Sequence, residues 1–187
     1  MGIEELVVAL SNDPFNPELN FACAKRYDSL LQSASAVSFY LRTAEYGFLT
    51  HPSLAYESLL RMSICFESQN DRIHSVSNCI LQALTVDKTR PEAYFLMSRF
   101  YERQSNWQEC YTWASLGLDL VPDAPNPLLD YPGSIGLIFE MAVAGWWIGR
   151  AEESKALFKV LLDSDLPDDY RASVIENLKR VGVDATV

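Results

Sequence analysis

The chain has 187 residues, of which 49% are hydrophobic, so it can bury a continuous core and is too apolar for a disordered chain. Its 15 Lys and Arg residues face 25 Asp and Glu residues, which gives a formal net charge of -10. Such a charge repels phosphate backbones and anionic lipid surfaces, so we expect neither nucleic acid nor membrane partners for this acidic protein.

No segment predicts export or insertion into a membrane. The first ten residues, MGIEELVVAL, are acidic and lack the basic start of a secretory leader, and Leu6 stands where a myristoylation motif needs Ser or Thr. The most apolar stretch, residues 135–148, is too short for a membrane span and contains Glu140. We therefore expect a soluble, cytoplasmic protein.

The first predicted element is a short amphipathic helix within residues 1–14. A loop follows at residues 47–52, where Thr50 is a candidate helix cap and Pro52 suits the first turn of the next helix. Asn and Asp at residues 70–71 mark a further turn. These breaks divide the first half of the chain into helical segments.

Residues 91–122 carry the clearest helical signal. Apolar and small residues recur there at helical spacing in two blocks, separated by the polar residues 104–106. This pattern predicts a helix, a tight turn and a second, antiparallel helix. Residues 123–133 follow as an extended insertion, because prolines forbid a continuing helix; they stand at Pro122, Pro125, Pro127 and Pro132. The insertion is interpreted either as a spacer or as a docking loop.

The last predicted helix covers Asp169–Val181. Its apolar residues gather on one face, and its charged residues lie elsewhere; the apolar ones are Tyr170, Val174, Ile175, Leu178 and Val181. Gly182 ends the helix. One polar face suits a helix that closes the end of a helical stack.

The stretch from Pro91 to Pro122 resembles a tetratricopeptide repeat (TPR), a helical hairpin of roughly 34 residues. The resemblance rests on large, small and aromatic residues at the places the family requires, namely Tyr94, Ser98, Tyr101, Cys110, Gly117 and Pro122. It implies an all-α fold, a right-handed α-solenoid of stacked antiparallel helical hairpins with about ten helices. We expect residues 1–187 to form a single domain of this kind.

Aligned to this repeat, the chain divides into a half repeat or cap, four repeats, the insertion and a capping helix. The half repeat or cap covers residues 1–14, and the capping helix covers residues 168–182. The four repeats cover residues 17–50, 51–90, 91–122 and 134–167, and the insertion covers residues 123–133. Three places depart from the pattern. Leu31 replaces a turn glycine, and Gly145 replaces an aromatic residue. Ile64 replaces a small residue, so we expect the second hairpin to be longer and more splayed than its neighbours. At Gly145, either Trp146 or Trp147 fills the space or the helices approach unusually closely.

Catalytic and metal-binding patterns are weak. The two histidines, His51 and His74, have no spacing to Cys, Ser or carboxylates that indicates nucleophile activation or a metal site. Four cysteines are spread one to a helix and are interpreted as small core residues; they are Cys23, Cys65, Cys79 and Cys110. No glycine-rich phosphate loop is present. We expect no catalytic residue, no metal, no cofactor and no enzymatic activity.

The resemblance implies that the first helix of each repeat lines a concave groove for a protein segment. The residues it assigns to this groove are Phe21, Lys25, Arg61, Phe95, Arg99, Arg103 and Phe139. Basic residues are over-represented among them for so acidic a chain, which predicts a peptide or protein partner with acidic and apolar side chains. The predicted function is a non-enzymatic protein–protein interaction scaffold.

Two alternatives remain open. The first is an accessory subunit or domain of a glycosyltransferase system. Residues 90–118 are also similar to repeat segments associated with glycosyltransferases, together with a second pattern at Gly149, Arg150, Glu152, Glu153, Ser154 and Phe158. The other alternative is a self-assembling structural protein, a homo-oligomer formed through its apolar end helices.

Overall fold

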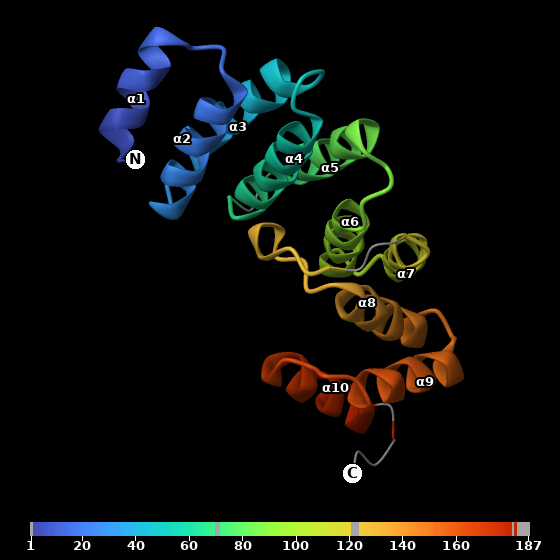
Figure 1. Ribbon diagram of the computed structural model, residues 1–187. Coiled ribbons are helices and arrows are strands. Elements are labelled where there is room, and N and C mark those ends of the chain that lie inside the picture. The colour runs from blue at the N-terminus through green and yellow to red at the C-terminus, as the bar shows by residue number, and fades with distance from the viewer. Residues whose placement is uncertain (1, 70–71, 121–123, 181, 183–187) are drawn as a thin grey trace. The chain divides into compact units, whose positions relative to one another are not determined.

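The computed structural model describes residues 2–69, 72–120, 124–180 and 182 (Figure 1). These residues form ten α-helices and one short 3-10 helix, and no strand. The chain divides into two compact units, which we call the N-terminal unit (residues 1–89) and the C-terminal unit (residues 90–187). No helix in the described ranges has both the length and the apolarity to cross a bilayer.

The N-terminal unit consists of five helices, each packed on the next along the chain. They are α1 (Ile3–Asn12), α2 (Pro17–Ser29), α3 (Ser33–Gly47), α4 (Pro52–Glu67) and α5 (Ile73–Val86). Proline occupies the first position of α2 and of α4, where no backbone hydrogen bond is lost. Asn16 caps α2, since its side chain accepts a hydrogen bond from the Leu19 amide at 3.0 Å. The predicted hairpins are therefore present.

The C-terminal unit consists of two helical hairpins, the insertion between them and a final helix. Its elements are α6 (Glu92–Arg103), α7 (Trp107–Leu118), the 3-10 helix η1 (Pro127–Leu129), α8 (Ser134–Trp147), α9 (Ala151–Leu162) and α10 (Asp168–Arg180). Helix α8 packs on α6, α7 and α9, and α10 packs on α9. The predicted last helix is present one residue earlier than expected, and its predicted end at Val181 lies outside the described residues.

Small residues lie where helices cross, as the repeat pattern predicts. Ala24, Ser98 and Ala142 are each 0% exposed. A Cβ atom added to Gly117 would lie 2.9 Å from atoms of both Tyr94 and Leu137, so α7 approaches its neighbours too closely for a side chain. The four cysteines are buried and unpaired with one another, in agreement with their interpretation as core residues.

Three hairpin turns share one geometry. Leu31, Ser105 and Gly149 all have positive φ, at 57°, 56° and 84°. In each turn the following amide donates to a carbonyl five residues back, as Gln32 does to Tyr27 at 3.0 Å. Leu31 thus adopts the conformation that glycine would supply, although it is 90% exposed and gains no packing.

Two predictions about the second hairpin, its helix cap and its length, can be compared with the structure. The prediction that Thr50 caps α4 is wrong, because the N-cap residue is His51, which makes no side-chain cap bond. The His51 amide donates to the Gly47 carbonyl at 2.7 Å, and this backbone bond places the helix start one residue later. Helix α4 has 16 residues and is the longest described helix. The predicted turn at residues 70–71 lies outside the described residues.

The insertion contributes to the core of the C-terminal unit. Leu129 and Tyr131 are 0% and 2% exposed, and the Tyr131 ring lies 5.4 Å from the Phe95 ring. The Asn126 side chain donates to Glu92 Oε1 at 3.0 Å. These contacts hold the described part of the insertion against α6.

Around Gly145 the helices pack at ordinary contact distances, so the unusually close approach is not seen. A Cβ atom added to Gly145 would meet the ring of Tyr111 and Ser154 Cβ at 3.7 Å, so residues of α7 and α9 occupy the space. Trp146 instead packs against the core between α8, α9 and α10.

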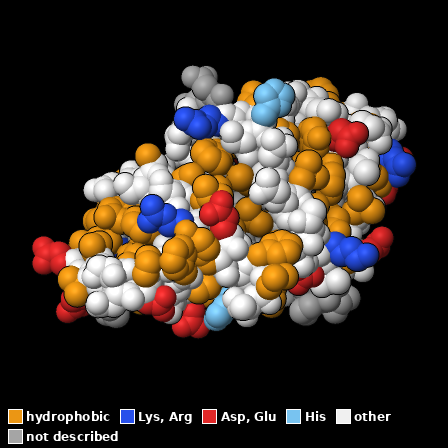
Figure 2. Space-filling model, turned by 90° about the horizontal axis from the view of Figure 1, so that it is seen from above, with side chains coloured by type: hydrophobic (Ala, Val, Ile, Leu, Met, Phe, Trp, Pro, Cys, Tyr) orange, Lys and Arg blue, Asp and Glu red, His pale blue; other side chains and the backbone are white. Residues whose placement is uncertain are grey.

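Apolar side chains also reach the surface, as Figure 2 shows for one face. The exposed apolar residues of α1 include Val7 and Val8.

Candidate partner-binding groove

Two adjoining cavities lie in the C-terminal unit and share Phe139 and Ser173. The larger has a volume of about 580 Å³ and the smaller about 370 Å³. Helices α6, α8 and α10 supply most of the walls. We call the two cavities together the aromatic groove; its lining residues are Arg99, Glu102, Trp107, Asp130, Phe139, Glu140, Val143, Trp146, Trp147, Phe158, Tyr170, Ser173, Glu176, Asn177 and Arg180.

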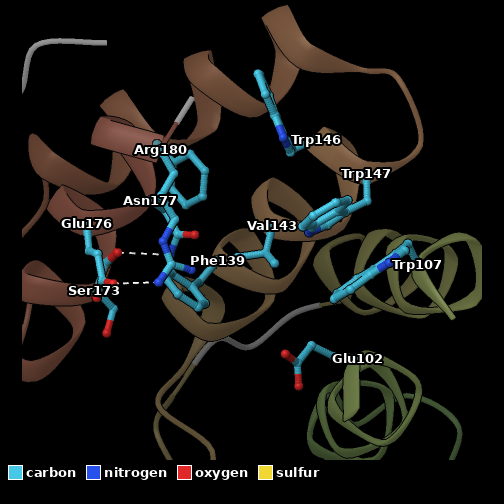
Figure 3. A pocket seen from close by; sticks show the side chains of 11 residues that line it. Glu102, Trp107, Phe139, Val143, Trp146, Trp147, Ser173, Glu176, Asn177 and Arg180 are labelled. Carbon is cyan, nitrogen blue, oxygen red and sulfur yellow. Dashed lines mark hydrogen bonds and ion pairs between the residues drawn. The ribbon is translucent and has the colours of Figure 1, made fainter. Parts of the chain in front are cut away.

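Tryptophans form one wall of the larger cavity (Figure 3). Trp107 begins α7 and Trp147 ends α8, and because these helices are antiparallel neighbours their rings stack at 5.4 Å with 16° between the planes. Trp147 is nevertheless 62% exposed. A large apolar ring that is held in place and left in water is typical of a binding surface.

Phe139 forms the floor that the two cavities share. Its ring meets Phe158 at 6.1 Å and Tyr170 at 5.5 Å, both edge to face. These contacts from α9 and α10 hold the ring in one orientation. On the opposite wall, Asn177 and Ser173 of α10 add polar groups, and the Asn177 amide donates to the Ser173 carbonyl at 2.9 Å.

The charged residues of the groove are unevenly paired. Glu176 and Arg180 pair with each other on α10 at 2.6 Å. Glu140 is 7% exposed and still reaches the smaller cavity, and the Cys110 thiol lies 3.8 Å from its Oε2 atom. The pKa of Glu140 is raised to about 7, first by burial and then by the charge of Glu102, although Arg99, Arg103 and the Cys110 hydrogen bond act in the opposite direction. The groove therefore holds a carboxyl that is costly to ionise.

The structure brings together only part of the residue set predicted for the groove. Arg99 and Phe139 line the cavities. Phe95 is 0% exposed and belongs to the core, and the Arg99 guanidinium lies over its ring at 5.5 Å. Arg103 is exposed on α6 and lines neither cavity.

The other three predicted residues lie in the N-terminal unit. Phe21 is half-buried and meets the Tyr40 ring at 5.9 Å, and Lys25 Nζ lies 5.7 Å from the centre of the Phe21 ring. Arg61 Nε donates to Asp28 Oδ2 at 2.9 Å, and the Tyr40 hydroxyl donates to the same oxygen at 2.9 Å. Arg61 thus ties α4 to α2.

Sequence reasoning missed the tryptophan pair and the wall from α10. Trp107 was placed in a helix but assigned no role, because its contact with Trp147 joins residues 40 positions apart. Helix α10 was interpreted only as a cap. Its place after a complete hairpin could have indicated an inner helix of a further half repeat, whose polar residues face the groove.

No group of three or more His, Cys, Asp or Glu residues that could hold a metal ion occurs among the residues that the structure describes. The arrangement offers apolar rings, hydrogen-bonding groups and charges on a concave surface.

Comparison with known proteins is informative at the level of the fold. No protein-family model and no curated protein sequence matches the chain. Among solved structures, the chain is similar to MamA, with a TM-score of 0.65 and 14% identity over 99% of this chain and 87% of that one. It is similar to a thermophilic TPR protein of Thermus thermophilus, with a TM-score of 0.62 and 16% identity over 95% of this chain and 89% of that one.

A Podospora anserina protein with nearly identical TPR-like repeats is also similar, with a TM-score of 0.61 and 15% identity over 89% of this chain and 86% of that one. None of the three links the chain to a glycosyltransferase. Identities this low show the fold alone. The predicted fold class is confirmed: the chain has the all-α helical-repeat solenoid fold of TPR proteins.

Proposed function

We propose that the chain is a non-enzymatic scaffold that binds a segment of a partner protein in the aromatic groove. The observation that carries the proposal is the exposed, stacked Trp147 at the edge of a cavity of about 580 Å³. Tryptophan is the residue type most enriched among those that dominate binding energy. A partner segment that covers it would remove a large apolar surface from water.

The geometry favours an apolar anchor on the partner. Trp146, Phe139 and Val143 line the larger cavity beside Trp147, so a leucine, phenylalanine or similar side chain fits between α8 and α10. The sequence-based preference for acidic side chains rested on Lys25, Arg61 and Arg99. Two of these three lie in the N-terminal unit, and Arg61 is already paired with Asp28.

Selection from a phage-displayed library of random peptides tests the proposal without a known partner. Three forms of the full chain are used: wild type, Trp147→Ala and Val160→Ala. Val160 is the matched control, because it is 52% exposed on α9 and lines neither cavity. Circular dichroism verifies that each form is folded.

We expect selected peptides to bind wild type and Val160→Ala equally and to bind Trp147→Ala at least about tenfold more weakly, as loss of a central aromatic anchor implies. The absence of any selected peptide, or equal binding to all three forms, contradicts the proposal.

Self-assembly is a second candidate, because the N-terminal helix exposes apolar surface. Val7 and Val8 of α1 are 47% and 63% exposed, and Phe15 in the following loop is 66% exposed. We infer that a homo-oligomer would form through this end. Light scattering over a range of concentrations tests it: a rise in mass that Val8→Glu abolishes supports self-assembly, and a constant monomer mass excludes it.

A further inference from the structure

The groove is richer in acidic than in basic groups. Four carboxyl groups line it, from Glu102, Asp130, Glu140 and Glu176, against the two guanidinium groups of Arg99 and Arg180. Arg180 is paired with Glu176, and Arg99 lies over the Phe95 ring. Residues 90–187 as a whole hold fifteen Asp and Glu against nine Lys and Arg. Charge complementarity therefore favours a basic partner segment.

Glu102 is the carboxylate best placed to receive a cation. It lies on α6 below Trp107 and points into the larger cavity (Figure 3). Its side chain is half-buried, and among the described residues no hydrogen bond or ion pair reaches its carboxylate. A half-buried carboxylate without a partner beside an apolar wall is stabilised by an incoming positive charge.

A second, independent observation comes from Glu140. It is more than nine-tenths buried, it reaches the smaller cavity, and the Cys110 thiol is the one donor to its carboxylate in the described part of the chain. Burial raises the pKa of Glu140, the charge of Glu102 adds to that rise, and the charges of Arg99 and Arg103 lower it. A cation that enters beside Glu140 would favour the ionised form of its buried carboxyl.

Within the proposed function, on which this inference rests, we propose that the groove selects its partner by one basic side chain, an arginine or lysine, seated against the Trp107–Trp147 pair with its charged head at Glu102. The long aliphatic stem of such a side chain covers exposed tryptophan surface. Its cationic head gains from the ring faces and from the carboxylate together.

The test uses peptides selected on the wild-type chain as described above. The first readout is their composition: groove-dependent peptides should be enriched in arginine or lysine next to an apolar residue. The second is the dissociation constant of one such peptide, measured by fluorescence polarisation with wild type, Glu102→Gln and Glu109→Gln. Glu109 lies on α7 and lines neither cavity, so it controls for the loss of one negative charge from the unit.

We expect Glu102→Gln to weaken binding by at least about tenfold, as loss of a hydrogen-bonded charge pair implies, and Glu109→Gln to change it less than about twofold. Replacing the peptide's basic residue by norleucine should cause at least the same loss on wild type, and a clearly smaller loss on Glu102→Gln, where only the attraction to the tryptophan rings is removed.

Peptides that bind in a Trp147-dependent way but carry no basic enrichment, or that bind Glu102→Gln unchanged, overturn this inference and leave the groove intact. Failure to select any Trp147-dependent peptide overturns the proposed function, and the inference with it.

Discussion

Asp28 of the N-terminal unit and Glu102 of the C-terminal unit differ in whether a neighbouring helix supplies a partner for the carboxylate. In the N-terminal unit, Asp28 of α2 receives hydrogen bonds from both Arg61 and Tyr40, so the charges of Asp28 and Arg61 are satisfied internally. In the C-terminal unit, Glu102 has no such partner among the described residues, and Glu140 is buried next to a thiol. Arg61 and Arg99 were both predicted on the inner face of the repeats. The difference teaches that a neighbouring helix decides whether such a residue is structural or available for binding.

The largest expected effect breaks the internal network of the N-terminal unit. Asp28→Ala leaves the Arg61 guanidinium and the Tyr40 hydroxyl without their shared acceptor, and the side chains of Arg61 and Asp28 are only 16% and 17% exposed. We expect a loss of about 3 to 5 kcal/mol in the free energy of unfolding, measured by urea denaturation with circular dichroism.

The matched change in the C-terminal unit is Glu176→Ala, which removes an exposed partner of Arg180. Its expected cost is below about 1 kcal/mol. Equal costs for the two substitutions would show that the Asp28 network contributes no more to stability than an exposed ion pair.

The next effect is a pH dependence that belongs to Glu140. Its pKa is raised from 4.5 to about 7, so the folded chain binds this proton more tightly than the unfolded chain does. Its contribution to the free energy of unfolding is therefore fully present below pH 4.5, is lost as the pH rises through about 7, and is constant above that value. A difference of this size corresponds to about 3 kcal/mol.

Urea denaturation at about pH 5 and about pH 8 measures this change, and Glu140→Gln should abolish it and make the chain more stable at the higher pH. The pKa values of Glu92 and Glu153 are lowered by hydrogen bonds, although burial acts to raise them. These two groups therefore reduce the free energy of unfolding only as the pH falls below the range in which Glu140 titrates. A stability that rises between pH 5 and pH 8 in wild type would contradict the assignment.

A smaller effect separates two glycines of the C-terminal unit. Gly117→Ala places a methyl group 2.9 Å from Tyr94 and Leu137, and we expect it to cost about 1 to 3 kcal/mol. Gly145→Ala meets its neighbours at 3.7 Å, an ordinary contact, so helix propensity should make it neutral or stabilising by up to about 1 kcal/mol. Thermal unfolding followed by circular dichroism compares them, and the reverse order would show that the helices do not pack as described.

The smallest effect concerns the turn that both units share. Leu31→Gly in the N-terminal unit and Ser105→Gly in the C-terminal unit relieve a left-handed conformation, and each should stabilise the chain by about 0.5 to 1 kcal/mol. Gly149→Ala should cost a similar amount. Chemical denaturation of the three variants provides the measurement; a loss of stability in Leu31→Gly would mean that this leucine has a packing role.

Helical spacing and repeat positions predicted most of the fold. Ala24, Ser98 and Ala142 lie at helix crossings because the hairpin leaves no room there, and that requirement is local enough to appear in the sequence. The start of α4 was missed, since a backbone bond from His51 to Gly47 competes with a Thr50 cap. Single-domain organisation, the absence of activity and the cellular location stay predictions.

The site was less accessible to sequence reasoning, because it depends on contacts between distant residues. Phe95 occupies a groove position of the repeat, but Tyr131 of the insertion covers it. Trp107 and Trp147 form one surface only because α7 and α8 run antiparallel. Arg61 has the residue type of a binding site, and its pairing with Asp28 joins residues 33 positions apart.

The most direct measurement of the central claim is a titration of the chain with a selected peptide that carries basic and apolar residues, followed by NMR of the four tryptophan indole N–H groups. Trp107, Trp146 and Trp147 line the groove, whereas Trp113 lies against Tyr94 outside it. Binding in the groove predicts shifts for the first three signals and none for Trp113. Binding that leaves the Trp107 and Trp147 signals unmoved would contradict the account.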